Sequence, residues 1–314
     1  MNNYTITKVV KNCILIIFIT LPFFCAQFKK LYVTIIALLL CYSLANAQTA
    51  LEFNGTNNKV TTTIDADLQV MPRTTWSAWI KPHGQLTTWQ FMVSMEDGGW
   101  DRFIAIEANS LGLSMGMTSN RWQTGASVTP GSWQHVVAIY DNGAMRFYYN
   151  GNEYTTNLNE GNHSSTGKFT IGANQAHSNH NHYKGQIDEV AVWNEALTAA
   201  EINALYNSGA GLDASSNSGN YTSSSNLVGY FKMDEGSGTQ ITDSSGSGSS
   251  GNLINMDNTN WVASPILSNN APTDITLSST SFNENIASAA TIATLSATDL
   301  DNGDSHTFSL ASSG

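Results

Sequence analysis

The chain has 314 residues, of which only 12% are charged, and its 24 acidic residues outnumber 13 basic ones to give a formal net charge of −11. This length is enough for two domains of ordinary size. A chain this acidic repels the phosphate backbone of nucleic acids, which argues against a nucleic-acid partner. The same charge favours divalent cations, because carboxylate oxygens are the ligands that calcium prefers.

The first 47 residues are predicted to be an export segment. Lys29 and Lys30 precede the apolar stretch LYVTIIALLLCYSLANA, which ends in an A-x-A cleavage pattern at residues 45–47. A second apolar stretch at residues 13–26 indicates either a true start codon downstream of Met1 or a short membrane hairpin. All three cysteines lie in this segment, so the mature chain can form no disulfide. We therefore expect a secreted or cell-surface protein that meets a membrane only through export or anchoring.

Residues 50–195 are predicted to form a series of short antiparallel strands. The stretch WSAWIKP, residues 76–82, places Trp, Ala and Ile at alternate positions, so that one face of the strand is apolar. Asn142-Gly143 separates two apolar runs and indicates a hairpin, because both residues tolerate a positive φ. Asn150-Gly151 indicates a second turn. Turns that recur about every 8–12 residues are typical of an all-β sandwich.

One short helix is predicted within WNEALTAAEINALYNSG, residues 193–209. Thr198 and Glu201 fit a capping box, while Leu197 and Ile202 fit the hydrophobic staple that fixes the entry to a helix. Gly209 suits the C′ position, where the chain adopts a left-handed conformation. We expect this helix to lie against an edge of the sandwich.

The remainder of the chain divides into two further parts. Residues 211–268 are predicted to be a Gly/Ser-rich accessory segment with short strands, because their aromatic residues require burial. Residues 269–314 begin a new β segment that is shorter than an ordinary sandwich. The predicted fold is therefore all-β: an antiparallel jellyroll β-sandwich with one short helix, followed by a partial second β-sandwich.

Several motifs follow one another in residues 48–210: LEFNG, SWQHVV, YNG, GQIDEV and EALTAAEINALY. In this order they resemble the laminin-G-like jellyroll domains of the concanavalin A-like lectin/glucanase group. The resemblance implies two antiparallel sheets, a concave face or loop rim that binds carbohydrate, and in many members one calcium ion. Within residues 211–268, the stretch YFKMDEGSGTQITDSSG resembles a segment that accompanies such jellyrolls in bacterial surface proteins.

Residues 269–314 resemble the first half of a bacterial cadherin-type repeat. The matching residues are Glu284 in NEN and the pair Asp299 and Asp301 in ATDLD. In that family these acids bind calcium at domain junctions, so the resemblance implies the same role here. The sequence departs from the family in the linker SNNAP, which lacks the usual acid, and in the second acidic motif, which does not follow.

Asp188 is the main candidate calcium ligand of the jellyroll. Regular strand alternation would place Asp188 and Glu189 on opposite faces, so we do not expect the two carboxylates to act as a pair. A buried, unpaired carboxylate is costly and is therefore neutralised, paired or bound to a metal. The resemblance favours a calcium ion between Asp188 and the N-terminal turn at Asn54. The alternative is an aspartate that is hydrogen-bonded in a tight turn after Gly185.

Candidate ligand-binding residues are aromatic or histidine side chains in irregular segments. Trp89, Trp100 and Trp122 could stack on sugar rings, or they could simply pack in the core or at the rim. His180 and His182 end the stretch AHSNHNH. They could contact a ligand at the rim or bind zinc or copper, and a solvated loop is the simpler interpretation.

No enzyme motif is found. Retaining glycosidases need two carboxyl groups about 5–5.5 Å apart, and the Glu-x-Asp-x-x-Glu pattern that supplies them in glucanases of this group is missing. We expect a non-catalytic, exported binding or adhesion protein. Its jellyroll would bind a glycan or an extracellular protein, and calcium would stabilise the jellyroll and the cadherin-type junction. The alternatives are the binding module of a larger polysaccharide-degrading enzyme and a structural stalk without a ligand.

Overall fold

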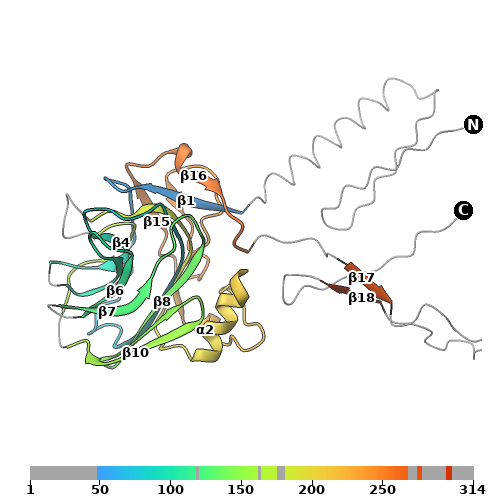
Figure 1. The fold of residues 1–314 in the computed structure, drawn as a ribbon, viewed down its shortest axis with the longest axis horizontal. Helices are drawn as coiled ribbons and strands as arrows, with labels where there is room; N and C mark the ends of the chain where they lie inside the picture. The colour runs from blue at the N-terminus through green and yellow to red at the C-terminus, as the bar shows by residue number, and fades with distance from the viewer. Residues whose placement is uncertain are drawn as a thin grey trace, which may run out of the picture. The chain divides into compact units, whose positions relative to one another are not determined.

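The computed structural model of this chain describes residues 48–98, 100–117, 120–161, 164–174 and 181–267, with the backbone of residues 274–277 and 295–298. Two antiparallel β-sheets face each other and enclose a common core (Figure 1). They belong to one compact unit, Ala47–Ser268. The predicted all-β sandwich with one short helix is therefore confirmed. The predicted export segment, residues 1–47, lies outside the described residues.

Sheet A contains eight strands among the described residues. Seven follow one another in space, and the eighth, β13, pairs with β12 beside them. In spatial order they are β10 (Asn152–Asn159), β9 (Ala144–Tyr149), β8 (Gln134–Asp141), β3 (Arg73–Pro82), β12 (Lys184–Trp193), β1 (Thr49–Asn54) and β16 (Trp261–Ala263), with β13 (Leu227–Phe231). Strand β12 thus has β1 beside its first half and β13 beside its second half.

Sheet B also contains eight described strands, all in antiparallel pairs. Their spatial order is β14 (Gln240–Ile241), β15 (Gly251–Ile254), β2 (Lys59–Thr61), β11 (Thr170–Ile171), β4 (Gln90–Met95), β5 (Arg102–Ile106), β6 (Gly112–Met117) and β7 (Asn120–Ser127). Three single 3₁₀ turns complete the unit: η1 (Asn207–Gly209), η2 (Ser224–Asn226) and η3 (Asn258–Asn260).

The core lies between the sheets and follows the strand alternation. Trp76, Ala78 and Ile80 of β3 are fully buried there, as their spacing predicts. The Trp76 ring meets the Phe169 ring edge-on, with centroids 5.0 Å apart. The hairpin signal is also confirmed, because Asn142 and Gly143 join β8 to β9 with φ angles of 52° and 94°.

Helix α2 (Ala199–Tyr206) covers part of the outer face of sheet A. Thr198 and Glu201 form the predicted capping box. Ile202 is buried against the outer face of the sheet in a second apolar cluster, so the helix packs on a face rather than an edge. The prediction that Gly209 ends the helix is wrong. Asn207 takes the left-handed conformation instead, with φ 44°, because asparagine also tolerates this region.

Residues 211–268 complete the jellyroll. Strand β13 pairs with β12, β16 pairs with β1, and β14 and β15 extend sheet B beyond β2. Phe231, Ile241 and Trp261 are buried in the same core as the strands of residues 48–210. The accessory segment is therefore a structural part of the sandwich, and the boundary at residue 210 does not separate two compact units.

Strands β17 (Asp274–Leu277) and β18 (Leu295–Thr298) form an antiparallel pair in a separate unit. The rest of residues 268–314 lies outside the described part of the chain, so the partial second sandwich and its cadherin-type character stay predictions.

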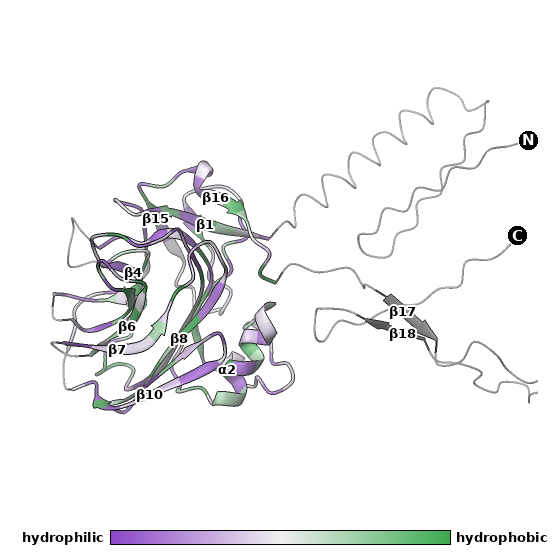
Figure 2. Ribbon diagram, viewed as in Figure 1, coloured by the Kyte–Doolittle hydropathy of each residue, from purple (hydrophilic) through white to green (hydrophobic). Residues whose placement is uncertain are grey.

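The outer strand of sheet A is polar. Strand β10 is hydrophilic along most of its length, as Figure 2 shows, and most of its residues are exposed. A polar edge discourages pairing with the strands of other molecules. Among the described residues, no helix is both long enough and apolar enough to cross a bilayer.

Candidate functional site

The predicted calcium ligands of the jellyroll lie apart. Asn54 is the last residue of β1 and stands opposite Lys184 of β12. Asp188 lies four residues farther along β12, which at about 3.3 Å per residue is about 13 Å away. The structure therefore does not bring Asn54 and Asp188 together.

The side-chain oxygens of Asn54 and Asp188 also already accept hydrogen bonds within the protein. The Asn54 side-chain oxygen accepts hydrogen bonds from the backbone N–H groups of Thr56 at 2.8 Å and Asn57 at 3.1 Å. Asp188 accepts hydrogen bonds from the Ser264 hydroxyl and from the backbone N–H of Glu189, the latter at 2.9 Å. Within the described parts of the chain, no three His, Cys, Asp or Glu residues are grouped to hold a metal. A calcium ion between Asn54 and Asp188 does not fit these residues.

The other predicted calcium ligands, Glu284, Asp299 and Asp301, lie outside the described residues. Their role in binding calcium stays a prediction from the resemblance to cadherin-type repeats.

A β-bulge at Glu189 changes the alternation of β12. Glu189 has φ 49°, and the register between β12 and β3 shifts between Asp188 and Ala191. A bulge adds one residue to one strand, so two residues of that strand lie opposite one residue of its partner. The residues just before and just after these two therefore face the same side of the sheet. Ile187 and Val190 both point into the core between the sheets. The expectation that Asp188 and Glu189 lie on opposite faces is therefore wrong: both lie on the outer side of sheet A.

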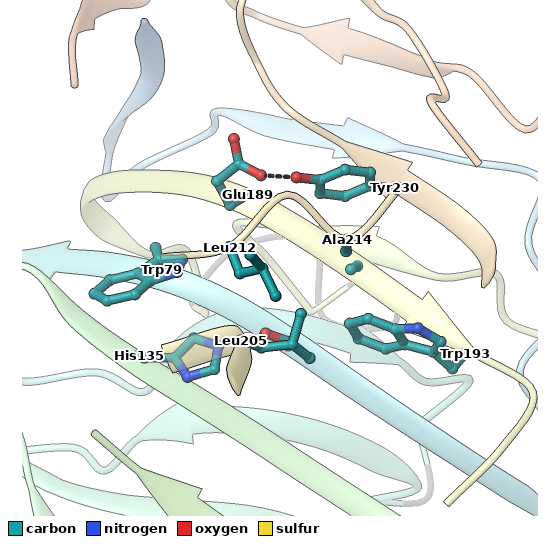
Figure 3. A pocket seen from close by; sticks show the side chains of 10 residues that line it. Trp79, His135, Glu189, Trp193, Leu205, Leu212, Ala214 and Tyr230 are labelled. Carbon is teal, nitrogen blue, oxygen red and sulfur yellow. Dashed lines mark hydrogen bonds between the residues drawn. The ribbon is translucent and has the colours of Figure 1, made fainter. Parts of the chain in front are cut away.

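These two carboxyl groups are buried at the point on β12 where its neighbour changes from β1 to β13. Asp188 is 1% exposed and Glu189 is 6% exposed. The Tyr230 hydroxyl donates a hydrogen bond to Glu189 (Figure 3). Burial raises the pKa of Asp188 well above its usual value, and the charge of Asp234 adds to this effect. Burial and the charge of Asp188 likewise raise the pKa of Glu189.

This acid pair predicts a pH-dependent stability. A carboxyl group with a raised pKa in the folded state binds its proton more tightly there than in the unfolded chain. The free energy of unfolding should therefore fall as the pH rises from about 4, the unfolded pKa, through the folded pKa values. Replacing Glu189 with glutamine removes one titrating group and the like charge beside Asp188, so the fall should become shallower. Urea unfolding between about pH 4 and 9 measures it.

The matched control is Glu153→Gln on the polar edge strand β10, where the side chain is exposed. This variant should show the same slope as the wild type. An equal slope in Glu189→Gln and the wild type would contradict the assignment of the pH dependence to the buried pair.

A small cavity lies between sheet A and helix α2 (Figure 3). Its lining includes Trp79, His135, Glu189, Leu205 and Tyr230, and it has room for no more than about one water molecule. His135 donates to or accepts from the Ser77 hydroxyl at 2.7 Å, and burial lowers the pKa of His135 to about 3. This cavity is too small for a sugar, so the neutral His135 has a packing role here.

An aromatic cluster lies on the outer face of sheet B. Phe91 and Phe103 form this cluster, and Trp89 and Trp100 pack against it while remaining half-buried. The neighbouring residues along these strands, such as Ile104, point into the core between the sheets, so the cluster faces the other way. The Trp89 and Trp100 rings meet edge to face with centroids 5.3 Å apart. Together they form an angled apolar surface that is reachable by solvent.

Polar groups border this aromatic cluster. The Arg121 guanidinium lies over the Trp89 ring, 5.0 Å from its centroid, and its Nε donates a hydrogen bond to Glu107 at 2.9 Å. Ser114 and Gln123 also donate to Glu107, at 2.6 and 2.8 Å. Aromatic faces beside amides, carboxylates and guanidinium groups are the combination that sugar recognition requires.

The predicted ligand-binding residues are only partly brought together. Trp89 and Trp100 meet in the aromatic cluster. Trp122 is 7% exposed and lies in the core between the sheets, so the prediction that it is a binding platform is wrong. The reason is its place on β7, where it pairs with the core residue Met115.

Of the two histidines predicted to bind a ligand, only His182 lies among the described residues. His182 is buried and bridged to Phe91 and Ala173, with its Nδ1 3.3 Å from the Asn58 carbonyl, so it is not an exposed rim residue. His180 lies outside the described residues, and its role stays a prediction. Sequence reasoning missed Phe91, Phe103 and Arg121, although Phe91 and Phe103 alternate with core residues on short strands and thus belong to an outer face.

The fold is that of a two-sheet jellyroll. Residues 54–203 match the family model of the concanavalin A-like lectin/glucanases superfamily, so this part of the chain is a jellyroll domain of that type. No curated protein sequence matches the chain.

Solved structures share the fold at low sequence identity. A Bacteroides ovatus protein described as a "putative carbohydrate binding protein" is 18% identical, with 66% of this chain and 58% of that chain covered and a TM-score of 0.52. This chain thus spans a little over half of that protein. A heptameric SAP-like pentraxin from Limulus polyphemus is 18% identical (51% and 82% covered, TM-score 0.40). The CBM40 domain of the Ruminococcus gnavus IT-sialidase, bound to sialyllactose, is 17% identical (51% and 99% covered, TM-score 0.39).

Proposed function

We propose that the jellyroll is a non-catalytic carbohydrate-binding domain and that the aromatic cluster on sheet B is its binding surface. The observation that carries this proposal is the pair Trp89 and Trp100, half-buried on an outer sheet face and bordered by hydrogen-bonding groups. Tryptophan is enriched at interfaces, where its ring supplies a large apolar contact area. The description of the Bacteroides ovatus protein of similar fold as a "putative carbohydrate binding protein" agrees with the proposal.

The outer face of sheet A, on the opposite side of the sandwich, is less suited to binding carbohydrate, which supports the assignment to sheet B. Helix α2 and the chain that follows it cover part of the outer face of sheet A through Ile202, Leu205 and Tyr221. The cavity beneath them has room for no more than about one water molecule. The buried acids Asp188 and Glu189 are on that covered side, where a polysaccharide cannot reach them, which supports a binding rather than a hydrolytic role.

The test is binding to a panel of polysaccharides. Affinity electrophoresis in gels that contain laminarin, xylan, arabinan, cellulose ethers or polygalacturonate compares the wild type with Trp89→Ala and Trp100→Ala. We expect the wild type to be retarded by at least one neutral polysaccharide, and each variant to bind about tenfold or more weakly, as truncated aromatic hot spots do.

The matched control is Trp133→Ala. Trp133 is also half-buried but lies just before β8, away from the aromatic cluster. This variant should bind as the wild type does, and circular dichroism should show all variants folded. Equal loss of binding in Trp133→Ala and Trp100→Ala, or full binding by both cluster variants, would contradict the proposal.

We also propose that the protein is exported and acts outside the cell or at its surface in adhesion or glycan capture. The export pattern of residues 1–47 and the resemblance of residues 269–314 to a cadherin-type repeat support this role. In it, Glu284, Asp299 and Asp301 would bind calcium at the domain junction. Isothermal titration of the chain with calcium, before and after replacing Asp299 and Asp301 with asparagine, tests that part separately.

A further inference from the structure

Arg121 and Glu107 form an ion pair at the border of the aromatic cluster. Arg121 precedes the core residue Trp122 on β7, so strand alternation turns its side chain to the outer face of sheet B. Its guanidinium lies over one face of the Trp89 ring, 5.0 Å from the centroid, and its Nε donates to Glu107 at 2.9 Å. The two charged side chains are 36% and 15% exposed. A ring on one side and a carboxylate on another therefore hold the guanidinium in place before any ligand arrives.

The two terminal nitrogens of Arg121 make no hydrogen bond within the described part of the chain, where only its Nε is used. Each of these nitrogens, Nη1 and Nη2, carries two N–H donors in the plane of the group. Arg102 differs, because its side chain is completely buried and all three of its nitrogens donate to other groups. A planar fork of donors such as that of Arg121 recognises two adjacent oxygens, either of a carboxylate or of neighbouring sugar hydroxyls.

Glu107 places a negative charge beside this fork. Ser114 and Gln123 donate to its Oε1 at 2.6 and 3.0 Å, and Gln123 also donates to its Oε2 at 2.8 Å. Burial raises the pKa of Glu107, but the hydrogen bonds from Ser114, Arg121 and Gln123 outweigh burial and leave the pKa below its usual value. The carboxylate is therefore ionised at neutral pH and compensates the charge of Arg121.

The other charged groups near the cluster do not favour an anionic ligand. Asp97 and Asp101 flank Trp100 in the sequence, and Arg102, which follows them, is paired with the buried Glu160. An anionic sugar loses far more hydration on binding than a neutral one, and only a net positive charge in the site offsets that loss. The Arg121–Glu107 pair has no net charge. It can therefore donate hydrogen bonds to a neutral sugar, but it does not offset the cost of binding an anionic one.

We propose that the Arg121–Glu107 pair makes the aromatic cluster selective for uncharged sugars. Nη1 and Nη2 of Arg121 donate to two neighbouring oxygens of a neutral sugar that lies against the exposed rings. Glu107 is a positioning residue that holds the guanidinium in place, and its charge disfavours sugars that carry a carboxylate. This selectivity rests on the proposed carbohydrate binding of the cluster.

The test compares neutral with anionic polysaccharides in affinity electrophoresis of the full chain. The wild type should be retarded by at least one neutral polysaccharide and not by polygalacturonate, whose sugars carry carboxyl groups. Glu107→Gln keeps the shape of the side chain but leaves the charge of Arg121 uncompensated. This variant should gain retardation by polygalacturonate while it still binds the neutral polysaccharide. Because the gain is electrostatic, it should decrease as the salt concentration is raised from about 0.05 to about 0.5 M.

Arg121→Gln removes the fork itself. This variant should bind the neutral polysaccharide about tenfold or more weakly, as the loss of hydrogen bonds from a charged group does, and should still not bind polygalacturonate. Glu153→Gln is the matched control, because it makes the same change of charge beside another arginine, Arg146, at the polar edge of sheet A. The control should bind as the wild type does, and circular dichroism should show all three variants folded.

The outcomes that overturn the selectivity differ from the one that overturns carbohydrate binding itself. Three results would each contradict the selectivity while the proposed function stands: wild-type retardation by polygalacturonate as strong as by any neutral polysaccharide, unchanged neutral binding in Arg121→Gln, or no gain of polygalacturonate binding in a folded Glu107→Gln. Absence of wild-type binding in every gel would refute the proposed function and the selectivity together.

Discussion

Replacing Phe231 with alanine is expected to lower the free energy of unfolding of the jellyroll by about 3–5 kcal/mol, as truncation of fully buried phenylalanines does. Phe231 belongs to β13, pairs with Val190 of β12, and is completely buried in the core between the sheets. Urea unfolding monitored by circular dichroism measures the change. The result matters because it tests whether residues 211–268 are an integral part of the sandwich.

Ser225→Ala is the control from the same segment. Ser225 is exposed in the 3₁₀ turn that precedes β13, so this variant should remain within about 0.5 kcal/mol of the wild type. If Phe231→Ala were no more destabilising than Ser225→Ala, the segment would be an appendage and the described core would be wrong.

The second large effect is expected at a completely buried ion pair. Arg102 of β5 and Glu160, which follows β10, both have fully buried side chains and make two hydrogen bonds to each other, one of them 2.9 Å long. Arg102 also donates to the backbone carbonyls of Ala66 and Met71 at 2.7 and 2.8 Å. It therefore ties together two loops and a strand. Removing one member of such a pair leaves an uncompensated buried charge, so Glu160→Gln should lower the free energy of unfolding by about 3–5 kcal/mol.

An exposed ion pair supplies the comparison. Arg73 and Asp141 are 3.1 Å apart with side chains that are 48% and 38% exposed. Because solvent screens such pairs, Arg73→Gln should cost no more than about 1 kcal/mol. Equal effects of Glu160→Gln and Arg73→Gln in urea unfolding would contradict the buried geometry of the Arg102 pair.

The parts of the fold that depend on local sequence could be predicted. The alternation in residues 76–80, the turn at Asn142-Gly143 and the capping box at Thr198 are each decided by neighbouring residues, and the structure confirms all three. The bulge at Glu189 could not be predicted, because it arises where β12 exchanges its neighbour β1 for β13. Such an exchange depends on strand order, and a single inserted residue reverses the facing that simple alternation predicts for the residues after it.

The residues of the candidate site likewise divide into those that local sequence indicates and those that only the tertiary fold brings together. Trp89 and Trp100 could be selected as accessible, half-buried aromatics from their polar surroundings, whereas Trp122 has similar surroundings in the sequence but pairs with the core residue Met115. The contact of Arg121 with Trp89 joins β7 to the segment before β4, so it depends on the tertiary fold. The separation of Asn54 and Asp188 could not be predicted for a comparable reason, since it is set by the register between β1 and β12.

The most direct measurement of the central claim is a titration of the indole N–H signals in a heteronuclear NMR spectrum. The chain has eight tryptophans, so these signals are few and can be assigned with single Trp→Phe variants. On addition of an oligosaccharide from the polysaccharide that retards the protein most, the signals of Trp89 and Trp100 should shift most, while those of the buried Trp122 and Trp193 remain in place. Saturable shifts confined to other tryptophans, with Trp89 and Trp100 unchanged, would show that carbohydrate binds elsewhere and would contradict this account.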